Sequence, residues 1–253
     1  MSVVALYVPG SRPDRFDKAA GTGAEVILDL EDSVAEQDRD RARADVAAWL
    51  SSYDGPVQVR VNAPASAALA ADLAALPRHV ELRVPKVQGV ADLEQVSGRR
   101  VHAIVESALG VEQALEIARA PEVVSIAAGE ADLAAELGVD GDQAFDWIRS
   151  RLVIAAGAAG LPAPMMSAYP AVRDVTGLTA SCRRGRRLGM WGRTAIHPSQ
   201  VPVIRVAFAP TGDEVAWANA VLAVLDRDGG VATLSDGSMV DAAMARRART
   251  ILG

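Results

Sequence analysis

The sequence contains few of the residues on which several common kinds of site depend. It has one cysteine, Cys182, so no disulfide can form within the chain, and we expect a reducing cytoplasm as its compartment. Three widely spaced histidines show no zinc-ligand spacing, so a metal site would have to be built from carboxylates. Among the 26 lysines and arginines only Lys18 and Lys86 are lysines, so a Schiff-base mechanism would depend on one of these two amines.

Two further shortages bear on the partners of the protein. Aromatic residues make up 4% of the chain and the formal net charge is −6, which argues against nucleic acid as the main partner. No apolar stretch reaches the roughly 18 residues that a membrane span requires, so no membrane partner is expected either.

What the sequence does contain is a repeated alternation of apolar runs and helical patterns. A chain of 253 residues, half of them hydrophobic, has the length of a single α/β barrel. We expect strands at residues 3–8, 25–30, 57–61, 81–84, 101–105, 123–127, 165–169 and 190–196. Eight strands that alternate mostly with helices predict a TIM (β/α)8 barrel, which we assign to residues 1–225.

The last part of the chain departs from this alternation. Residues 226–253 predict a short hairpin with an Asp-Gly turn, followed by a basic helix. A barrel does not need such an extension, so we expect it either to cover the site or to dock on a neighbouring subunit.

The stretch of residues 101–138 places acids at the ends of two neighbouring strands. The first apolar run ends at Glu106, and the second breaks at Gly129 and leads to Glu130 and Asp132. Sites of α/β proteins lie at the carboxyl ends of parallel strands. Acids that leave coordination positions open suit Mg²⁺, which takes oxygen ligands and keeps room for water and substrate.

Charged residues also end the second and third strands. Three acids follow each other closely after the second strand, and we assign Glu31 to the site and Asp29 to a structural role, because strand alternation places Asp29 opposite its leucine neighbours. Arg60 lies in the third strand, where its charge cannot be buried unpaired. Either a ligand carboxylate or a neighbouring acid must therefore face Arg60, and we favour the ligand.

Basic residues that follow the fourth and the first strand also belong to the predicted rim, as does His197 at the end of the eighth. Lys86 follows the fourth strand and is expected to be a charge partner of the nearby carboxylates; a Schiff-base amine and a surface residue are the alternatives. The loop after the first strand carries Arg12 and leads into a helix with Lys18, which is typical of either a phosphate cradle or a solvated turn.

With these residues in place, the chain resembles the HpcH/HpaI aldolase and citrate lyase family, and within it the CitE-like branch. The resemblance covers nearly the whole chain. It rests on segments that occur in the family's order: YVPGSRPDRFDKA, VILDLEDSV, VRVNAP, RVPKV, VESALGVEQA, AGEADLAAELG, TAIHPSQV and DGSMVDAAMARRARTIL.

The resemblance implies a TIM barrel that binds Mg²⁺ and makes or cleaves carbon–carbon bonds in acyl thioesters of hydroxy acids. It matches Glu106 and Asp132 to the metal ligands, whereas Glu130 does not match. Arg60 matches the arginine that contacts the 2-oxo acid. Glu31 and Asp32 match an acidic pair near the metal-bound waters, and we count Asp32 and Lys86 among the substrate-binding residues.

The resemblance also implies partners. Arg12 and Lys18 match basic residues on the coenzyme A side, and a homotrimer or hexamer is expected. Asp241 matches an aspartate of the tail that enters the neighbouring subunit's site in malyl- and citramalyl-CoA lyase relatives. Two features depart from the family's pattern and leave the substrate open: Met165 and Met166, where an aspartate often ends the seventh strand, and Arg193, in place of a common lysine.

These residues predict a Mg²⁺-dependent lyase that splits a hydroxyacyl-CoA of malyl-, citramalyl- or citryl-CoA type into acetyl-CoA and a 2-oxo acid, or runs the reverse condensation. Asp241 from a neighbouring chain is the first candidate for the base, and Glu31 is the second. The alternatives are a metal-free aldolase that uses Lys86 as a Schiff base and a non-catalytic thioester-binding subunit of a lyase complex.

Overall fold

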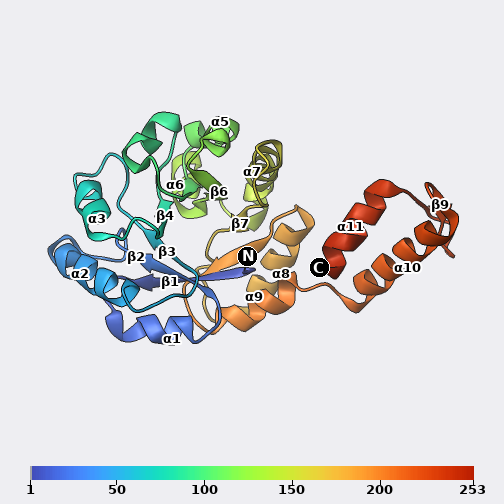
Figure 1. The fold of residues 1–253 in the computed structure, drawn as a ribbon, viewed down its shortest axis with the longest axis horizontal. Coiled ribbons are helices and arrows are strands. Elements are labelled where there is room, and N and C mark those ends of the chain that lie inside the picture. The colour runs from blue at the N-terminus through green and yellow to red at the C-terminus, as the bar shows by residue number, and fades with distance from the viewer. Residues whose placement is uncertain (1) are drawn as a thin grey trace. The chain divides into compact units, whose positions relative to one another are not determined.

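A computed structural model describes residues 2–253, with the side chain of residue 228 left out. The chain forms two compact units, Met1–Phe208 and Ala209–Gly253. The first unit contains the barrel and the second contains the extension, and each is described by itself (Figure 1).

The first unit is built around eight strands. In chain order they are β1 (Val4–Pro9), β2 (Glu25–Asp29), β3 (Val57–Arg60), β4 (Glu81–Val84), β5 (Val101–Val105), β6 (Val123–Ala128), β7 (Met165–Met166) and β8 (Gly192–Ala195). They pair in parallel in the order β6-β5-β4-β3-β2-β1-β8-β7. Eight parallel strands form a nearly closed barrel with helices around it, which confirms the TIM-barrel expectation.

Helices surround this barrel. They are α1 (Phe16–Ala20), α2 (Arg39–Leu50), α3 (Leu69–Ala75), α4 (Ala108–Glu112), α5 (Ala114–Arg119), α6 (Glu130–Leu137), α7 (Asp146–Ala158), α8 (Val175–Arg187) and α9 (Gln200–Phe208). Four 3₁₀ segments join them: η1 (Pro13–Arg15), η2 (Glu36–Asp38), η3 (Val90–Val96) and η4 (Asp142–Phe145).

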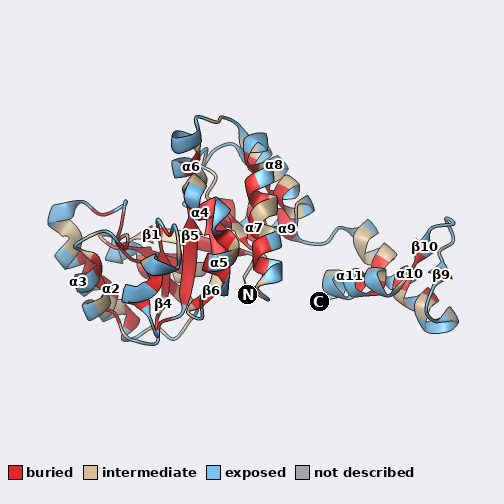
Figure 2. Cartoon of the chain, turned by 90° about the horizontal axis from the view of Figure 1, so that it is seen from above, coloured by how far each residue is buried: buried red, intermediate tan, exposed pale blue. Residues whose placement is uncertain are grey.

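The strands are largely buried and mostly apolar, with buried polar exceptions such as Gln58, Arg83 and His102. All five residues of β5 are buried, as expected for a parallel strand covered by helices (Figure 2). Polar capping residues mark where helices begin: the hydroxyl of Ser107 accepts the N–H of Gly110 at α4, and the carboxylate of Asp174 accepts the N–H of Gly177 at α8.

Two strands are each three residues shorter than the sequence indicates: β7, and β8, which covers 192–195 instead of 190–196. The run of residues 165–169 predicts a strand of five residues, but β7 ends at Met166. The carbonyl oxygen of Ser167 accepts a 2.8 Å bond from Nε of the buried Arg193. A side chain thus binds the backbone where the strand was expected to continue.

The second unit has its own small core. It consists of α10 (Gly212–Asp228), β9 (Ala232–Thr233), β10 (Met239–Val240) and α11 (Ala242–Leu252). β9 and β10 pair antiparallel, so the predicted hairpin and closing helix are present. Our boundary after residue 225 falls inside α10, whereas the units divide between Phe208 and Ala209 because α10 packs with the hairpin and α11.

Within the described residues, no helix has both the length and the apolar character needed to cross a membrane.

Candidate active site

A cavity of about 480 Å³ opens at the carboxyl ends of the barrel strands. Tyr7 of β1, Asp29 of β2, Arg60 of β3 and Arg83 of β4 contribute to its lining, and Glu106 follows β5. Its position agrees with the rule that barrel sites lie at this end.

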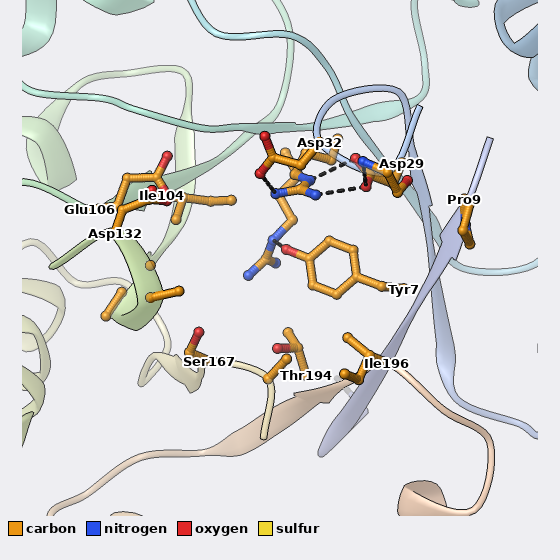
Figure 3. A pocket seen from close by; sticks show the side chains of 17 residues that line it. Tyr7, Pro9, Asp29, Asp32, Ile104, Glu106, Asp132, Ser167, Thr194 and Ile196 are labelled. Carbon is orange, nitrogen blue, oxygen red and sulfur yellow. Dashed lines mark hydrogen bonds and ion pairs between the residues drawn. The ribbon is translucent and has the colours of Figure 1, made fainter. Parts of the chain in front are cut away.

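Two acids stand together on one wall of the cavity (Figure 3). Glu106 is only 8% exposed, and Asp132 lies in the first turn of α6. Burial, and then the charge of Asp132, raise the pKa of Glu106 to about 8. Without a cation, Glu106 therefore keeps its proton at neutral pH for most of the time.

The local backbone explains how Glu106 fits into this wall. A Cβ atom at position 129 would overlap the Glu106 side chain, so only glycine fits without a shift at this position between β6 and α6. The main-chain N–H of Lys86 donates a 2.6 Å hydrogen bond to Oε1 of Glu106. The carboxylate is thereby held by the segment that follows the neighbouring strand.

Glu130 has a different environment from Asp132. Its carboxylate accepts two hydrogen bonds from Arg149, of 2.7 Å from Nε and 2.9 Å from Nη2. Arg149 is fully buried and also pairs with Asp142 at 2.7 Å. Glu130 therefore holds the start of α6 to η4 and α7, and Asp132 is the acid of that turn that lines the cavity.

The charge of Arg60 is matched by acids of the second strand and its loop. Its Nε and Nη2 each donate a 2.7 Å bond to the carboxylate of Asp29, which is 2% exposed. Its Nη1 lies 3.0 Å from Glu31 and 3.3 Å from Asp32. We favoured a ligand as the partner of Arg60, but the structure places a neighbouring acid there. Asp29 has the structural ion-pair role that we assigned to it, and it also lines the cavity.

Glu31 and Lys86 form a second pair beside Arg60. Burial raises the pKa of Glu31 to about 7, and the charge of Arg60 opposes this shift. Nζ of Lys86 lies 3.6 Å from Oε1 of Glu31, and that carboxylate is the main cause of a raised pKa of Lys86. Lys86 thus has the geometry of a charge partner. Both residues line a second hollow of about 340 Å³ rather than the main cavity.

Three candidate residues lie outside this cluster. Arg12 is exposed and forms two bonds with Asp14, of 2.8 and 2.9 Å. Lys18 is exposed on α1. Asp241 belongs to the second unit, where its Oδ1 accepts the N–H groups of residues 243 and 244 and caps α11. The structure therefore gives Asp241 a local role and leaves its catalytic assignment untested.

Sequence reasoning missed other cavity residues, including Tyr7, Arg83, Ser167 and Thr194. The hydroxyl of Tyr7 accepts a 2.8 Å bond from Nε of Arg83. A signal for Arg83 was available, because a charge inside the apolar run of residues 81–84 is as unusual as Arg60 in the preceding strand. Tyr7 and Thr194 look like ordinary strand residues in the sequence, and only the fold brings them to the cavity.

The donor set of the acid wall fits a hard divalent cation. Within residues 2–253 no group of three or more Asp, Glu, His or Cys side chains is arranged to hold a metal ion. Glu106 and Asp132 would therefore be the two protein ligands, with the other positions left to water and substrate oxygens, as is common for Mg²⁺. Their mutual repulsion, seen in the raised pKa of Glu106, would be relieved by such a cation.

Comparison with known proteins gives consistent matches over most of the chain. The model of the HpcH/HpaI aldolase/citrate lyase family matches residues 4–198. A citrate lyase subunit beta-like protein from Mycobacterium tuberculosis is 36% identical over 257 residues, covering 98% of this chain and 93% of its own length.

Two further relatives come from Cereibacter sphaeroides. A (3S)-malyl-CoA thioesterase is 34% identical and covers 93% of this chain and 88% of its own length. An L-malyl-CoA/beta-methylmalyl-CoA lyase is 31% identical, and the match covers 98% of this chain and 92% of that protein's length.

Among solved structures, the CitE protein of Mycobacterium tuberculosis in complex with magnesium, acetoacetate and coenzyme A superposes with a TM-score of 0.91. It is 34% identical to this chain, and the match covers 99% of this chain and 97% of that one.

Proposed function

The chain belongs to the HpcH/HpaI aldolase/citrate lyase family, and on this premise we propose that it is a Mg²⁺-dependent carbon–carbon lyase. Its substrate would be a hydroxyacyl-CoA thioester of malyl-, citramalyl- or citryl-CoA type, split into acetyl-CoA and a 2-oxo acid, or made from them. The observation that carries this proposal is the buried pair of Glu106 and Asp132 in a cavity that also contains Arg60. The magnesium and coenzyme A in the related structure support it.

In this proposal the two partners bind on different residues. Mg²⁺ on Glu106 and Asp132 would act as a Lewis acid toward the oxygen of the 2-oxo acid. The first turn of α6 lines the same wall through Ala131 and Asp132, so main-chain N–H groups of that turn would face the carboxylate of that acid. Arg12 and Lys18 remain our candidates for the coenzyme A side, where exposed cations would meet phosphates.

Cleavage requires two proton movements. The hydroxyl of the substrate loses its proton, its electrons form the new carbonyl, and the broken carbon–carbon bond leaves an enolate of acetyl-CoA that must gain a proton at carbon. Arg60, oriented by Asp29, would offer its remaining N–H donors to the oxygen on which negative charge develops.

The base for the condensation direction has two candidates. Asp241 of a neighbouring chain is the first, by resemblance. Glu31 is the second, and its pKa of about 7 suits proton transfer near neutral pH, because both protonation states are populated.

An activity screen tests the proposed reaction. The purified protein with Mg²⁺ would be offered malyl-, citramalyl-, citryl- and 3-hydroxy-3-methylglutaryl-CoA, and the products separated by liquid chromatography. We expect acetyl-CoA and a 2-oxo acid from at least one substrate, and loss of turnover in Asp132→Ala with the barrel intact. Full activity of that variant would contradict the assignment of Asp132 as a metal ligand. No cleavage of any of the four substrates would contradict the proposed reaction.

Thioester hydrolysis is a second candidate reaction, because the malyl-CoA thioesterase relative is 34% identical. The same screen separates the two reactions. A lyase releases acetyl-CoA, whereas a thioesterase releases free coenzyme A and the intact hydroxy acid. Binding of a thioester without any product would instead favour a non-catalytic subunit.

The Schiff-base alternative has a weaker structural basis. The nearby Glu31 carboxylate favours the protonated form of Lys86, and an ammonium group is not a nucleophile. We expect that borohydride with substrate leaves no label on Lys86 and that EDTA abolishes turnover. Trapping together with EDTA resistance would favour the metal-free aldolase.

We further propose a homotrimer or hexamer in the cytoplasm, with Asp241 acting in a neighbouring chain's site. Exposed apolar side chains on α7 support an interface: Trp147 and Ile154 are 61% and 64% exposed and lie seven residues apart on one helix face. Light scattering after size exclusion measures the assembly. Mixing inactive Asp241→Asn with inactive Asp132→Ala should restore part of the activity, and a mixture that stays inactive contradicts the shared site.

A further inference from the structure

The floor of the cavity contains a buried positive charge whose partners are neutral. Arg83 is 4% exposed and lines the cavity from β4. Its Nε donates a 2.8 Å bond to the hydroxyl of Tyr7, and its Nη1 donates a 3.1 Å bond to Oε1 of Gln58. Among residues 2–253, no carboxylate forms an ion pair with it. Arg60, the other arginine of the cavity, has the bidentate Asp29 instead.

The neighbours of Arg83 hold its side chain in place but do not neutralise its positive charge. The side-chain NH2 group of Gln58 donates a 2.8 Å hydrogen bond to Glu25. The side-chain oxygen of Gln58 therefore accepts the bond from Arg83. The Tyr7 ring contacts both guanidinium groups, with Cζ of Arg60 and of Arg83 lying 5.1 and 5.7 Å from the ring centroid. Arg83 is thus held in one orientation by groups that leave several of its five N–H donors available.

A guanidinium stays charged in proteins, and a buried charge without a counter-charge is costly. A bound ligand can supply the missing charge. A carboxylate is a good fit, because it can accept two parallel N–H bonds from arginine. The negative charge of this ligand would lie beside Arg83 and Tyr7, apart from the pair of Glu106 and Asp132 that would hold the metal.

We propose that Arg83 binds a second carboxylate of the substrate, so that the preferred 2-oxo acid is a dicarboxylic acid rather than a monocarboxylic one. The inference rests on the proposed function. The 2-oxo carboxylate is bound at the acid wall and α6, and the distal carboxylate of the same molecule reaches Arg83. Arg83 is then the residue that sets specificity, and Tyr7 and Gln58 position it.

Binding of chain-matched pairs tests this subsite. Titration calorimetry of the Mg²⁺-loaded protein would compare oxaloacetate with 2-oxobutanoate, and 2-oxoglutarate with 2-oxopentanoate. We expect at least one dicarboxylate to bind about 10- to 100-fold more tightly than its matched monocarboxylate, the range of a charged hydrogen-bonded pair. Equal binding within both pairs overturns the proposal, and this comparison needs no substitution.

Three variants attach the preference to Arg83. Arg83→Met should remove the preference by weakening the binding of the dicarboxylate. Arg83→Lys should keep part of the preference because the positive charge remains. Arg100→Met is the matched control, because Arg100 is an exposed cation that pairs with Glu81 outside the cavity, and its preference should equal that of the wild type. A preference that survives in folded Arg83→Met contradicts the assignment, and if that variant does not fold, a preference undiminished in Arg83→Lys does so.

The outcomes also separate this inference from the proposed reaction. A dicarboxylate preference in binding, without condensation of any 2-oxo acid with acetyl-CoA, would retain the subsite and reject the lyase. Condensation that uses both members of each pair equally would retain the lyase and reject the subsite.

Discussion

The main-chain N–H of Lys86 donates a 2.6 Å hydrogen bond to Oε1 of Glu106, and Lys86 does so with a φ angle of 57°. It is the non-glycine residue with positive φ in the described chain, residues 2–253. This left-handed conformation is unfavourable for a residue with a Cβ atom. The conformation of Lys86 lets its N–H reach the buried carboxylate of Glu106 in the proposed metal site.

Replacing Lys86 by glycine and by alanine separates the backbone from the side chain. Both variants lose the ammonium group, but only alanine keeps the Cβ atom. We expect Lys86→Gly to be more stable than Lys86→Ala by about 1 kcal/mol, because glycine adopts positive φ without steric cost. Urea unfolding measures the difference, and equal midpoints would show that the φ angle carries no strain.

Gly129→Ala should disturb the acid wall without unfolding the barrel. The added Cβ would overlap the Glu106 side chain, whereas the φ of −95° at Gly129 suits alanine. We expect weaker Mg²⁺ binding and at least tenfold lower turnover, since a misplacement of about 1 Å costs on the order of 100-fold. Gly157→Ala on the exposed side of α7 is the control, because its Cβ meets nothing within 4 Å. Equal Mg²⁺ affinity in both variants would argue against Glu106 as a ligand.

The raised pKa of Glu106 predicts how pH affects the metal-free protein. The folded pKa is about 8 and the ordinary value is 4.5, so the folded state binds more protons than the unfolded state between these values. The contribution of Glu106 to stability is therefore full below pH 4.5 and is lost as the pH rises through 8. In EDTA, the melting temperature of the wild type should fall more steeply over this range than that of Glu106→Gln.

Glu31 shifts in the same direction and remains in both proteins, so the difference between the two profiles reports Glu106 together with its charge coupling to Glu31. Mg²⁺ should reverse the loss, and its apparent affinity should rise with pH up to about 8, because binding displaces the proton. Identical pH profiles for the two proteins would contradict the raised pKa.

The buried ion pairs of Arg149 should matter more for stability than a half-exposed pair nearby. Arg149 is fully buried, and the side chains of its partners Glu130 and Asp142 are 12% and 32% exposed, so Arg149→Met leaves two partly shielded acids unpaired, which costs up to about 3–5 kcal/mol. Arg184→Met breaks the partly exposed pair with Asp146 and should cost less, because solvent screens that pair. Denaturant unfolding compares the two free energies, and equal losses would contradict the role of burial.

Much of the fold could be predicted because its signals are local. The apolar runs that became β4 and β5 have the same ends in the sequence and in the structure. The length of β7 could not be predicted, because Arg193 from another strand binds the carbonyl of Ser167. The division between the units also depends on packing, since the contacts of α10 with α11 cannot be seen in either helix alone.

The sequence by itself determined the eight strands, the polar residues at their carboxyl ends and the lack of alternatives to a carboxylate metal site. These follow from residue types and from spacing along the chain. Only the tertiary structure decided that Arg60 faces Asp29, that Glu130 faces Arg149, and that the buried Arg83 has neutral partners. Such pairings depend on distances between side chains that lie far apart in sequence, and these distances exist only after the barrel has formed.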